Sequence, residues 1–401
     1  MTNQNKPGYK HTPLGWIPEE WSIKEFGRFA SASTAKYVPS TNENRRCIEL
    51  EHINQETGSI NGYISSTNQK STKNIFKKGQ VLFGKLRPYL KKYWLADFDG
   101  VCSSEVWVLQ ANSEDCCNEY LFRLIQQHRF IQVANVSSGS KMPRADWDFV
   151  AGFPFALPTS QERKKIAGIL STWDEAINKA QQLIAQLQQR NKGLMQQLLT
   201  ARDGWIEKKV SDIFERVVRK NTNGSTNVIT ISAQRGFVKQ NDFFKKLVAS
   251  ETLDNYFLVR KGEFCYNKSY SNGYDWGATK RLNDFNEAVV TTLYICFRIK
   301  DEKEYSGDYF EYFFDANILD KGLAKIAHEG GRAHGLLNVT PGDFFSLKIN
   351  LPTYDEQIRI FKILSAARNE LRLNEQKLAA LQQQKKGLMQ KLLTGEVRVK
   401  I

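Results

Sequence analysis

NKGLMQQLLT occupies residues 191–200 and KKGLMQKLLT occupies residues 385–394, so one chain of 401 residues contains nearly the same ten letters twice. The two copies belong to longer repeats, residues 158–200 and 352–394, which align without a gap at an offset of 194 residues. Roughly twenty of the about 43 aligned positions are identical, far more than chance gives for a repeat of this length. The chain therefore contains one unit written twice.

Apolar side chains in both repeats recur at alternating steps of four and three residues, which is typical of a coiled-coil seam. The first seam consists of Ile166, Leu170, Trp173, Ile177, Ala180, Ile184, Leu187, Asn191, Leu194 and Leu198. The second consists of Ile360, Leu364, Ala367, Leu371, Asn374, Leu378, Leu381, Lys385, Leu388 and Leu392. We predict that the apolar members form the interface of an antiparallel helix pair; the alternative is that each helix packs separately on its own domain.

Two features interrupt these helices. Asn191, Asn374 and Lys385 place polar groups in the seam, where such groups cost stability and fix the register, so a specific partner helix is implied. Gly193 and Gly387 cost about 1 kcal/mol each in a helix interior relative to alanine. A cost repeated at the same place predicts close backbone approach near the end of each helix, where another helix or domain crosses.

The segments that precede the helices are related to each other more faintly. IFKKGQVLFGKLRPYL (75–90) resembles YFLVRKGEFCYNKSYS (256–271), which matches Gly79 with Gly262 and Lys85 with Lys268. GVCSSEVWVLQ (100–110) resembles AVVTTLYICFRI (288–299), and both read as core strands. One clear amphipathic helix follows in each segment. The same short elements are therefore expected in both segments.

These observations predict an α+β fold with a duplicated arrangement of two globular regions and two long helices. The expected parts are a mixed α/β domain at 1–157, a central helix at 158–203, a second mixed domain at 204–351 and a C-terminal helix at 352–401. We expect the two long helices to form an antiparallel coiled coil that separates the domains.

The overall charge narrows the choice of partner. Lysine and arginine outnumber aspartate and glutamate by 57 to 43, giving a net charge of +14 and a pI near 9.3. Such a balance favours a polyanionic partner, most simply nucleic acid, although a merely soluble basic protein is the alternative. The first twenty residues lack the apolar core of a signal peptide, and no apolar run is long enough to cross a bilayer. Six cysteines without a Cys-x-x-Cys pair indicate a reduced, cytoplasmic protein with free thiols.

Sequence signs of catalysis are absent. No Pro-Pro pair occurs that could belong to the base-clamping element of an adenine methyltransferase, and no Gly-Lys-Ser/Thr phosphate loop is found. Asp203 with Glu207, Lys208 and Lys209 is a commonplace pattern that hardly supports a magnesium site. The five histidines are scattered. We therefore expect a chain that is not an enzyme and has no metal site.

Several motifs in combination resemble a known family over nearly the whole chain. They are LGWIPEEW, GKLRPYL and GVCSSEVWVL in the first half, KGEFCYNKSYSNGYDWGATKRL and GGRAHGLLNVTPGDFF in the second, and the paired GLMQQLLT and GLMQKLLT helices. In this order they resemble the DNA-specificity subunit of type I restriction–modification enzymes. The resemblance implies two target-recognition domains, each of which reads one half of a split, asymmetric site in double-stranded DNA, with the helices acting as a spacer.

The resemblance also implies partners. The helices and adjoining surfaces would bind two methyltransferase subunits, and restriction and translocase subunits would join that core. S-adenosylmethionine would then belong to the methyltransferase subunits, and ATP and magnesium to the restriction subunit, so that no cofactor is expected on this chain. The seam from Ile166 to Leu198 is about 48 Å long at roughly 1.5 Å per residue, on the order of 14 base pairs at about 3.4 Å each. We therefore predict a bipartite target of roughly 12–15 base pairs.

Residues able to contact DNA are long or bidentate donors in the loops that the two segments share. In the first segment the candidates are Lys85, Arg87, Tyr89, Lys91, Lys92, Ser138, Ser140, Lys141 and Arg144. In the second they are Lys268, Tyr270, Ser271, Tyr274, Lys280, Arg281, Arg332, His334 and Asn338. For any single lysine or arginine, contact with phosphate is expected more often than contact with a base.

Two other classes of protein stay open at this stage. One is a nuclease whose active site the sequence does not reveal. The other is a coiled-coil scaffold or adaptor without sequence-specific DNA readout, which would bind duplex DNA with a steep salt dependence but without preference for any sequence.

Overall fold

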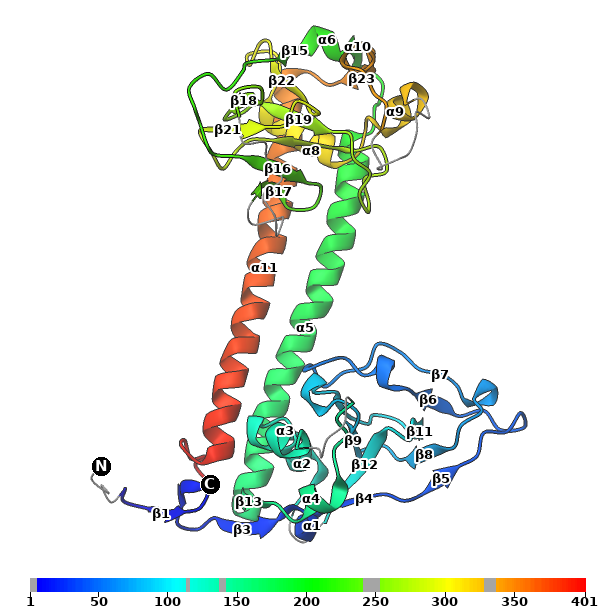
Figure 1. Ribbon diagram of the computed structural model, residues 1–401, viewed down its shortest axis with the longest axis vertical. Helices are drawn as coiled ribbons and strands as arrows, with labels where there is room; N and C mark the ends of the chain where they lie inside the picture. The colour runs from blue at the N-terminus through cyan, green and yellow to red at the C-terminus, as the bar shows by residue number, and fades with distance from the viewer. Residues whose placement is uncertain (1–5, 113–115, 137–141, 241–252, 328–336) are drawn as a thin grey trace. The chain divides into compact units, whose positions relative to one another are not determined.

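The computed structural model describes residues 6–112, 116–136, 142–240, 253–327 and 337–401. The chain divides into two compact units. Unit 1 contains residues 1–181 and 376–401, and unit 2 contains residues 182–375. Each unit combines one globular region with a stretch of both long helices, so the boundary between the units falls inside the helices (Figure 1).

The two long helices are α5 (Ser160–Leu199) and α11 (Tyr354–Thr394). In unit 1 the first part of α5 shares a core with the last part of α11, since Leu170 and Leu392 belong to the same buried cluster. In unit 2 the last part of α5 shares a core with the first part of α11, where Leu199 and Leu364 are buried together. The helices therefore run antiparallel in each unit, and the predicted fold class is confirmed.

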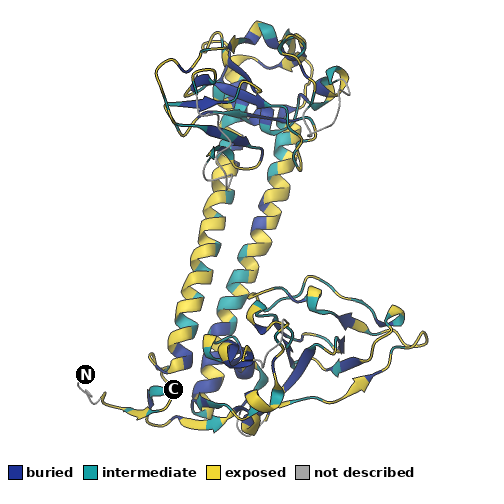
Figure 2. Ribbon diagram, in the orientation of Figure 1, coloured by how far each residue is buried: buried dark blue, intermediate teal, exposed yellow. Residues whose placement is uncertain are grey.

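Buried and half-buried residues follow the predicted seam along both helices, and most residues between the seam positions are exposed (Figure 2). Two of the polar seam residues have partners on the other helix. The Asn191 side-chain amide donates to the Ala367 carbonyl oxygen at 2.9 Å, and the Lys385 ammonium pairs with the Asp174 carboxylate. Asn374 instead donates to the Glu370 carbonyl oxygen of its own helix at 2.9 Å.

The two helix glycines do not behave as predicted. A Cβ atom built on Gly193 or Gly387 would meet no heavy atom within 4 Å, apart from the helix itself, in the described part of the chain. Both glycines are exposed. No helix or domain among the described residues therefore makes the predicted close approach at these positions.

A four-stranded sheet of the same order forms the frame of both globular regions. In unit 1 the order is β10 (Tyr93–Leu95), β9 (Val81–Gly84), β12 (Val106–Ala111) and β4 (Ala30–Ala32). In unit 2 it is β20 (Ala278–Arg281), β19 (Phe264–Asn267), β22 (Ile295–Ile299) and β15 (Phe214–Val217). All neighbouring strands in both sheets are antiparallel. The faint similarity in the sequence thus corresponds to one repeated sheet.

Two helices follow the frame strands in each unit and join the sheet to a long helix. They are α2 (Asn118–Leu124) and α3 (His128–Ala134) in unit 1, and α8 (Gly307–Asp315) and α9 (Asp320–Ile326) in unit 2. Tyr120 and Phe130 are fully buried with Leu170 of α5, and Tyr309 and Phe310 are fully buried in the cluster that contains Leu364 of α11. Burial of each such side chain contributes roughly 2 kcal/mol.

The remaining elements of the repeat lead into and out of the long helices. A two-stranded sheet precedes each helix: β3 (Ser22–Glu25) with β13 (Pro154–Leu157), and β14 (Ile206–Lys209) with β23 (Lys348–Leu351). The short helices are α1 (Phe26–Phe29), α4 (Trp147–Ala151), α6 (Val210–Ile213) and α10 (Pro341–Ser346). Unit 1 also has the hairpin β1 (Tyr9–Thr12) and β2 (Gly15–Pro18).

Beyond the frame, the two units pair their outer strands alike but differ in the loops that connect them. Unit 1 has a second sheet in the order β5 (Lys36–Tyr37), β8 (Lys73–Phe76), β11 (Gly100–Cys102), β6 (Arg46–Ile48) and β7 (Ile64–Ser65). Its 3-10 turns are η1 (Leu50–His52), η2 (Ser66–Asn68) and η3 (Pro88–Leu90). In unit 2 the antiparallel pair of β18 (Phe257–Arg260) and β21 (Glu287–Val290) corresponds to β8 and β11, and the hairpin of β16 (Ile229–Ser232) and β17 (Gly236–Lys239) corresponds to β6 and β7. A parallel bridge joins Val228 to Val289, as β6 joins β11 in unit 1. Residues 49–63 connect β6 to β7, whereas residues 233–235 connect β16 to β17.

An ion pair fastens each globular region to a long helix, and its polarity is reversed between the units. In unit 1, Arg123 of α2 pairs with Asp174 of α5, and the arginine side chain is only 4% exposed. In unit 2, Arg368 of α11 lies 3.2 Å from Glu311 and 2.8 Å from Asp315 of α8, and its side chain is 44% exposed. Asp174 and Arg368 are equivalent positions of the sequence repeat.

A glutamate in the first turn of each long helix is bound by an arginine that follows the other helix. Glu162 is fully buried and accepts hydrogen bonds from Trp21 Nε1 at 2.9 Å and from Arg398 Nε at 2.6 Å. Its counterpart Glu356 pairs with Arg202, whose side chain is 51% exposed. The same contact is therefore buried in unit 1 and open to solvent in unit 2.

Candidate nucleic-acid interface

The two loops predicted to contact DNA in unit 1 lie side by side. One follows β9, and the other precedes α4. Arg87 N–H donates to the Pro143 carbonyl oxygen at 2.8 Å, and Ala145 N–H donates to the Lys85 carbonyl oxygen at 2.8 Å. These bonds bring Lys85, Arg87 and Arg144 together at the end of β9.

The loop after β9 has unusual backbone geometry. Arg87 and Lys91 flank η3 with φ angles of +53° and +49°, a left-handed region that side chains other than glycine rarely adopt. Arg87 and Tyr89 are exposed. Such strain is tolerated where the surrounding structure holds a residue in position for a function. The loop therefore presents one arginine and one tyrosine to solvent in a fixed arrangement.

Other predicted cations of unit 1 have partners inside the unit. Lys91 Nζ lies 2.5 Å from Glu56, Lys92 Nζ donates to the Leu50 carbonyl oxygen at 2.5 Å, and Arg144 Nε lies 3.0 Å from Glu105. The charges of Lys91 and Arg144 are partly neutralised, and the Lys92 ammonium is held at a carbonyl oxygen. Lys85 and Arg87 have no ion-pair partner among the described residues. Three further candidates, Ser138, Ser140 and Lys141, lie outside the described residues.

The corresponding loops of unit 2 also meet. Leu337 N–H donates to the Lys268 carbonyl oxygen at 3.0 Å, and Lys268 Nζ donates to the Val339 carbonyl oxygen at 3.4 Å. Ser271 and Tyr274 pair their backbones in a tight turn, beside the exposed Tyr270. Asn338 is exposed as well. The candidates Arg332 and His334 lie outside the described residues.

Lys280 and Arg281 of β20 are occupied within unit 2. Lys280 Nζ lies 2.6 Å from Asp315 and donates to the Tyr274 hydroxyl at 3.2 Å. Burial opposes the charged form, but the attraction and hydrogen bonds of Asp315 and Tyr274 together outweigh it and raise the pKa of Lys280. Arg281 lies 2.5 Å from Asp308. These two side chains fasten the frame sheet to α8 and leave little charge for a phosphate.

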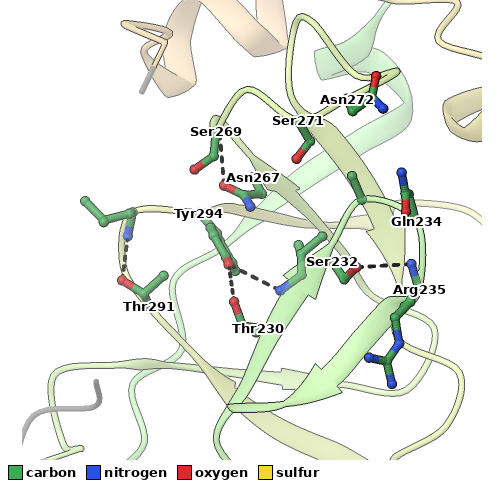
Figure 3. A pocket seen from close by; sticks show the side chains of 13 residues that line it. Thr230, Ser232, Gln234, Arg235, Asn267, Ser269, Ser271, Asn272, Thr291 and Tyr294 are labelled. Atoms are coloured by element: carbon green, nitrogen blue, oxygen red, sulfur yellow. Dashed lines mark hydrogen bonds between the residues drawn. The ribbon is translucent and has the colours of Figure 1, made fainter. Parts of the chain in front are cut away.

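A polar cleft of about 570 Å³ lies in unit 2 and was not foreseen from the sequence. Figure 3 shows that its side chains come from three segments: the β16–β17 hairpin, the loop after β19, and the turn between β21 and β22. The labelled residues are Thr230, Ser232, Gln234, Arg235, Asn267, Ser269, Ser271, Asn272, Thr291 and Tyr294. A hairpin at ITISAQRGFVK was open to prediction, since a polar turn with glycine separates two apolar runs.

The cleft of unit 2 lies at the same end of the frame strands that carries the basic loop in unit 1. Asn267 ends β19 as Gly84 ends β9, and Lys268 follows the one strand as Lys85 follows the other. Tyr294 directly precedes β22, and Glu105 directly precedes the equivalent strand β12. Both globular regions therefore present donors and acceptors at equivalent places in the repeated frame.

The described residues offer little for metal or thiol chemistry. They contain no group of three or more histidine, cysteine, aspartate or glutamate side chains placed to hold a metal ion. All six cysteines are unpaired, and burial raises the pKa of Cys47 to about 12. Glu207, part of the faint magnesium pattern, lies 2.7 Å from Lys348. No described helix is both long and apolar enough to cross a membrane.

Comparison with known proteins gives consistent matches. The type I restriction modification DNA specificity domain matches residues 18–189 and 202–383. A putative type I restriction enzyme MjaX specificity subunit from Methanocaldococcus jannaschii is 24% identical over 437 aligned positions, covering 98% of this chain and 97% of that protein. The EcoDI specificity subunit from Escherichia coli is 28% identical over 161 residues, which are 39% of this chain and 36% of that protein. The HsdS subunit from Thermoanaerobacter tengcongensis shares the fold, with a TM-score of 0.51 and 18% identity over 95% of this chain and 98% of that chain.

Proposed function

Because this chain belongs to the type I restriction modification DNA specificity family, we propose that it is the non-catalytic specificity subunit of a type I restriction–modification complex. Each globular region reads one half of a bipartite, asymmetric site in duplex DNA. We assign target recognition to residues 1–157 and 204–351, and the spacer to residues 158–203 and 352–401. The helix pair then sets the distance between the two half-sites.

One observation carries this proposal: the strand pairing is repeated in both units while the loops of the outer parts differ. The four-stranded sheets share one strand order, and the outer strands pair alike, but residues 49–63 connect β6 to β7 whereas residues 233–235 connect β16 to β17. A repeated frame suits two similar approaches to the same kind of duplex, and unlike outer parts suit unlike base sequences. The net charge of +14 favours contact with the phosphate backbone.

The repeated helix ends support two copies of one partner. Lys192, Gly193 and Gln196 are identical to Lys386, Gly387 and Gln390, and all six residues are exposed. No contact within the described chain accounts for this identity. We infer that each face binds one methyltransferase subunit, with restriction and translocase subunits joining afterwards. S-adenosylmethionine would be bound by the methyltransferase subunits, and ATP and magnesium by the restriction subunit.

The test is to co-express this chain with its methyltransferase subunits in a host without adenine methylation and to map the methylated adenines across the genome. We expect one bipartite sequence with two unlike halves. Replacing residues 1–157 with the equivalent region of another specificity subunit should change one half only. If both halves changed together, the assignment of one half to each globular region would be wrong.

The spacer role has its own test. A seven-residue insertion after Gln186, combined with one after Leu373, keeps the heptad pattern of both helices and lengthens each by about 10 Å. The gap between the half-sites should grow by about three base pairs. Four residues inserted after Gln186 alone should abolish recognition or change the gap, because the seam then loses its partner. An unchanged gap in both variants contradicts the spacer role.

The second candidate is a coiled-coil scaffold without sequence readout, which the charge and the helix pair alone would also fit. This candidate predicts no sequence-specific methylation on co-expression. It also predicts that purified chain binds random duplexes with equal affinity and a steep dependence on salt.

A further inference from the structure

The cleft of unit 2 has an unusual lining for a basic protein. Hydroxyl and amide side chains dominate it, no carboxylate lines it, and Arg235 is its one ionised side chain among the described residues. The positive charge of the chain, +14 in total, is therefore not concentrated in this cleft. A surface of this kind is poorly suited to holding phosphate by charge, and well suited to exchanging hydrogen bonds with uncharged polar groups.

Internal hydrogen bonds hold the floor of the cleft and leave its rim unpaired. The Tyr294 hydroxyl lies 3.0 Å from Thr230 Oγ1 and accepts from Ile231 N–H at 3.3 Å, which fixes the ring against the hairpin. The Asn267 side-chain oxygen accepts from Ser269 N–H at 3.0 Å. Gln234 and Asn272 are exposed, and their amides have no hydrogen-bond partner within the described residues. Side chains held in place at the floor and unpaired amides at the rim are suited to bind an external ligand.

The place of the cleft in the fold points to the kind of ligand. It is open, and it lies at the end of β19, which corresponds to the end of β9 where unit 1 carries the Arg87 loop. It involves residues 233–235, which connect β16 to β17 where unit 1 has the different connection 49–63 between β6 and β7. A feature that reads a particular sequence is expected where the two halves differ, and a feature that holds the backbone where they agree.

We propose, resting on the proposed function, that this cleft is the base-reading surface of the second recognition domain and that Gln234 and Asn272 read base edges there. A side-chain amide has one donor and one acceptor side by side, which matches the N7 and N6 groups of adenine in the major groove. An A·T pair in the second half-site is therefore the expected ligand. Arg235, beside Gln234 on the hairpin turn, contacts a phosphate and orients the duplex.

The experiment uses the full chain co-expressed with its methyltransferase subunits, with genome-wide mapping of adenine methylation. Gln234→Ala should relax preference at one base pair of the second half-site by roughly 5- to 100-fold, the range for one bidentate contact. Gln234→Glu should move that preference toward cytosine, whose amino group donates to a carboxylate. Arg235→Ala should lower methylation at all sites without changing the sequence.

Asn286→Ala is the matched control, because Asn286 is an exposed amide of unit 2 that does not line the cleft. It should leave both half-sites unchanged. Retained reading of the first half-site shows that each variant folds and assembles. If Gln234→Ala and Asn272→Ala both leave the second half-site intact, or only lower methylation uniformly, the cleft is not the reading surface although the specificity function stands. Absence of any sequence-specific methylation with the unaltered chain would reject the specificity function itself.

Discussion

The globular regions of units 1 and 2 agree in their frame and differ in how they are fastened to the helices. In unit 1 the globular region supplies the arginine, Arg123, and the long helix supplies Asp174. In unit 2 the globular region supplies Glu311 and Asp315, and the helix supplies Arg368. Exchanging the helices between the regions would bring like charges together. The reversal therefore disfavours wrong pairing between two helices whose sequences are otherwise similar.

The largest expected difference between the units is at the buried glutamate. Glu162→Ala removes the acceptor for Trp21 Nε1 and the partner of Arg398, and it should lower the free energy of unfolding by about 3 kcal/mol. Glu356→Ala should lower it by at most about 1 kcal/mol, because Arg202 stays solvated. Urea denaturation followed by circular dichroism measures both. Glu162→Gln keeps a hydrogen-bond acceptor, so its loss of unfolding free energy should lie between those of the two alanine variants. Equal losses for Glu162→Ala and Glu356→Ala would contradict the expected difference between the units.

A smaller contrast is expected at the reversed ion pairs. Asp174→Ala leaves Arg123 buried without a counter-ion and also frees Lys385, so a loss of about 2 kcal/mol is expected. Arg368→Ala should cost about 1 kcal/mol or less, because its side chain is 44% exposed. The midpoints of urea unfolding report the difference. If Arg368→Ala were the more damaging change, exposure would not explain the contrast.

The smallest expected effect is a gain in stability. Gly193→Ala and Gly387→Ala should each raise the free energy of unfolding by about 1 kcal/mol, since alanine is the better helix former and the added Cβ meets no neighbour. If a methyltransferase subunit binds these faces, both variants should retain less of it in co-purification. Lys377→Ala, on an exposed part of α11 away from the glycine, is the control. Lower stability of either glycine variant would contradict the open surroundings.

The sequence was sufficient for features that depend on local periodicity. A heptad pattern repeats within one helix, so α5 and α11 each begin two residues after the expected start; α5 ends at Leu199 instead of 203, and α11 ends at Thr394 instead of 401. Gly79 and Gly262 were matched by sequence, and both occupy turns with φ angles of +84° and +88°. The repeated frame follows from such short-range signals.

Features that depend on contacts between residues far apart in the sequence could not be predicted. Lys280 and Arg281 read as free cations until Asp315 and Asp308, about thirty residues away, are placed beside them. The cleft joins residues 230–235 with residues 267–272 and 291–294, and no local pattern reveals that these segments meet. The glycine prediction has a different outcome: a repeated local cost was attributed to the close approach of another helix or domain, and none is present among the described residues.

The composition of unit 1 has a consequence for synthesis on the ribosome. Unit 2 is one continuous stretch of chain, but unit 1 draws on residues 376–401 as well as 1–181. Leu392 and Leu393 complete the core of the region that is translated first, and Arg398 reaches its buried glutamate. The earliest-made region must therefore wait, with apolar surface uncovered, until the latest-made residues emerge, and it is the part most dependent on chaperones during translation.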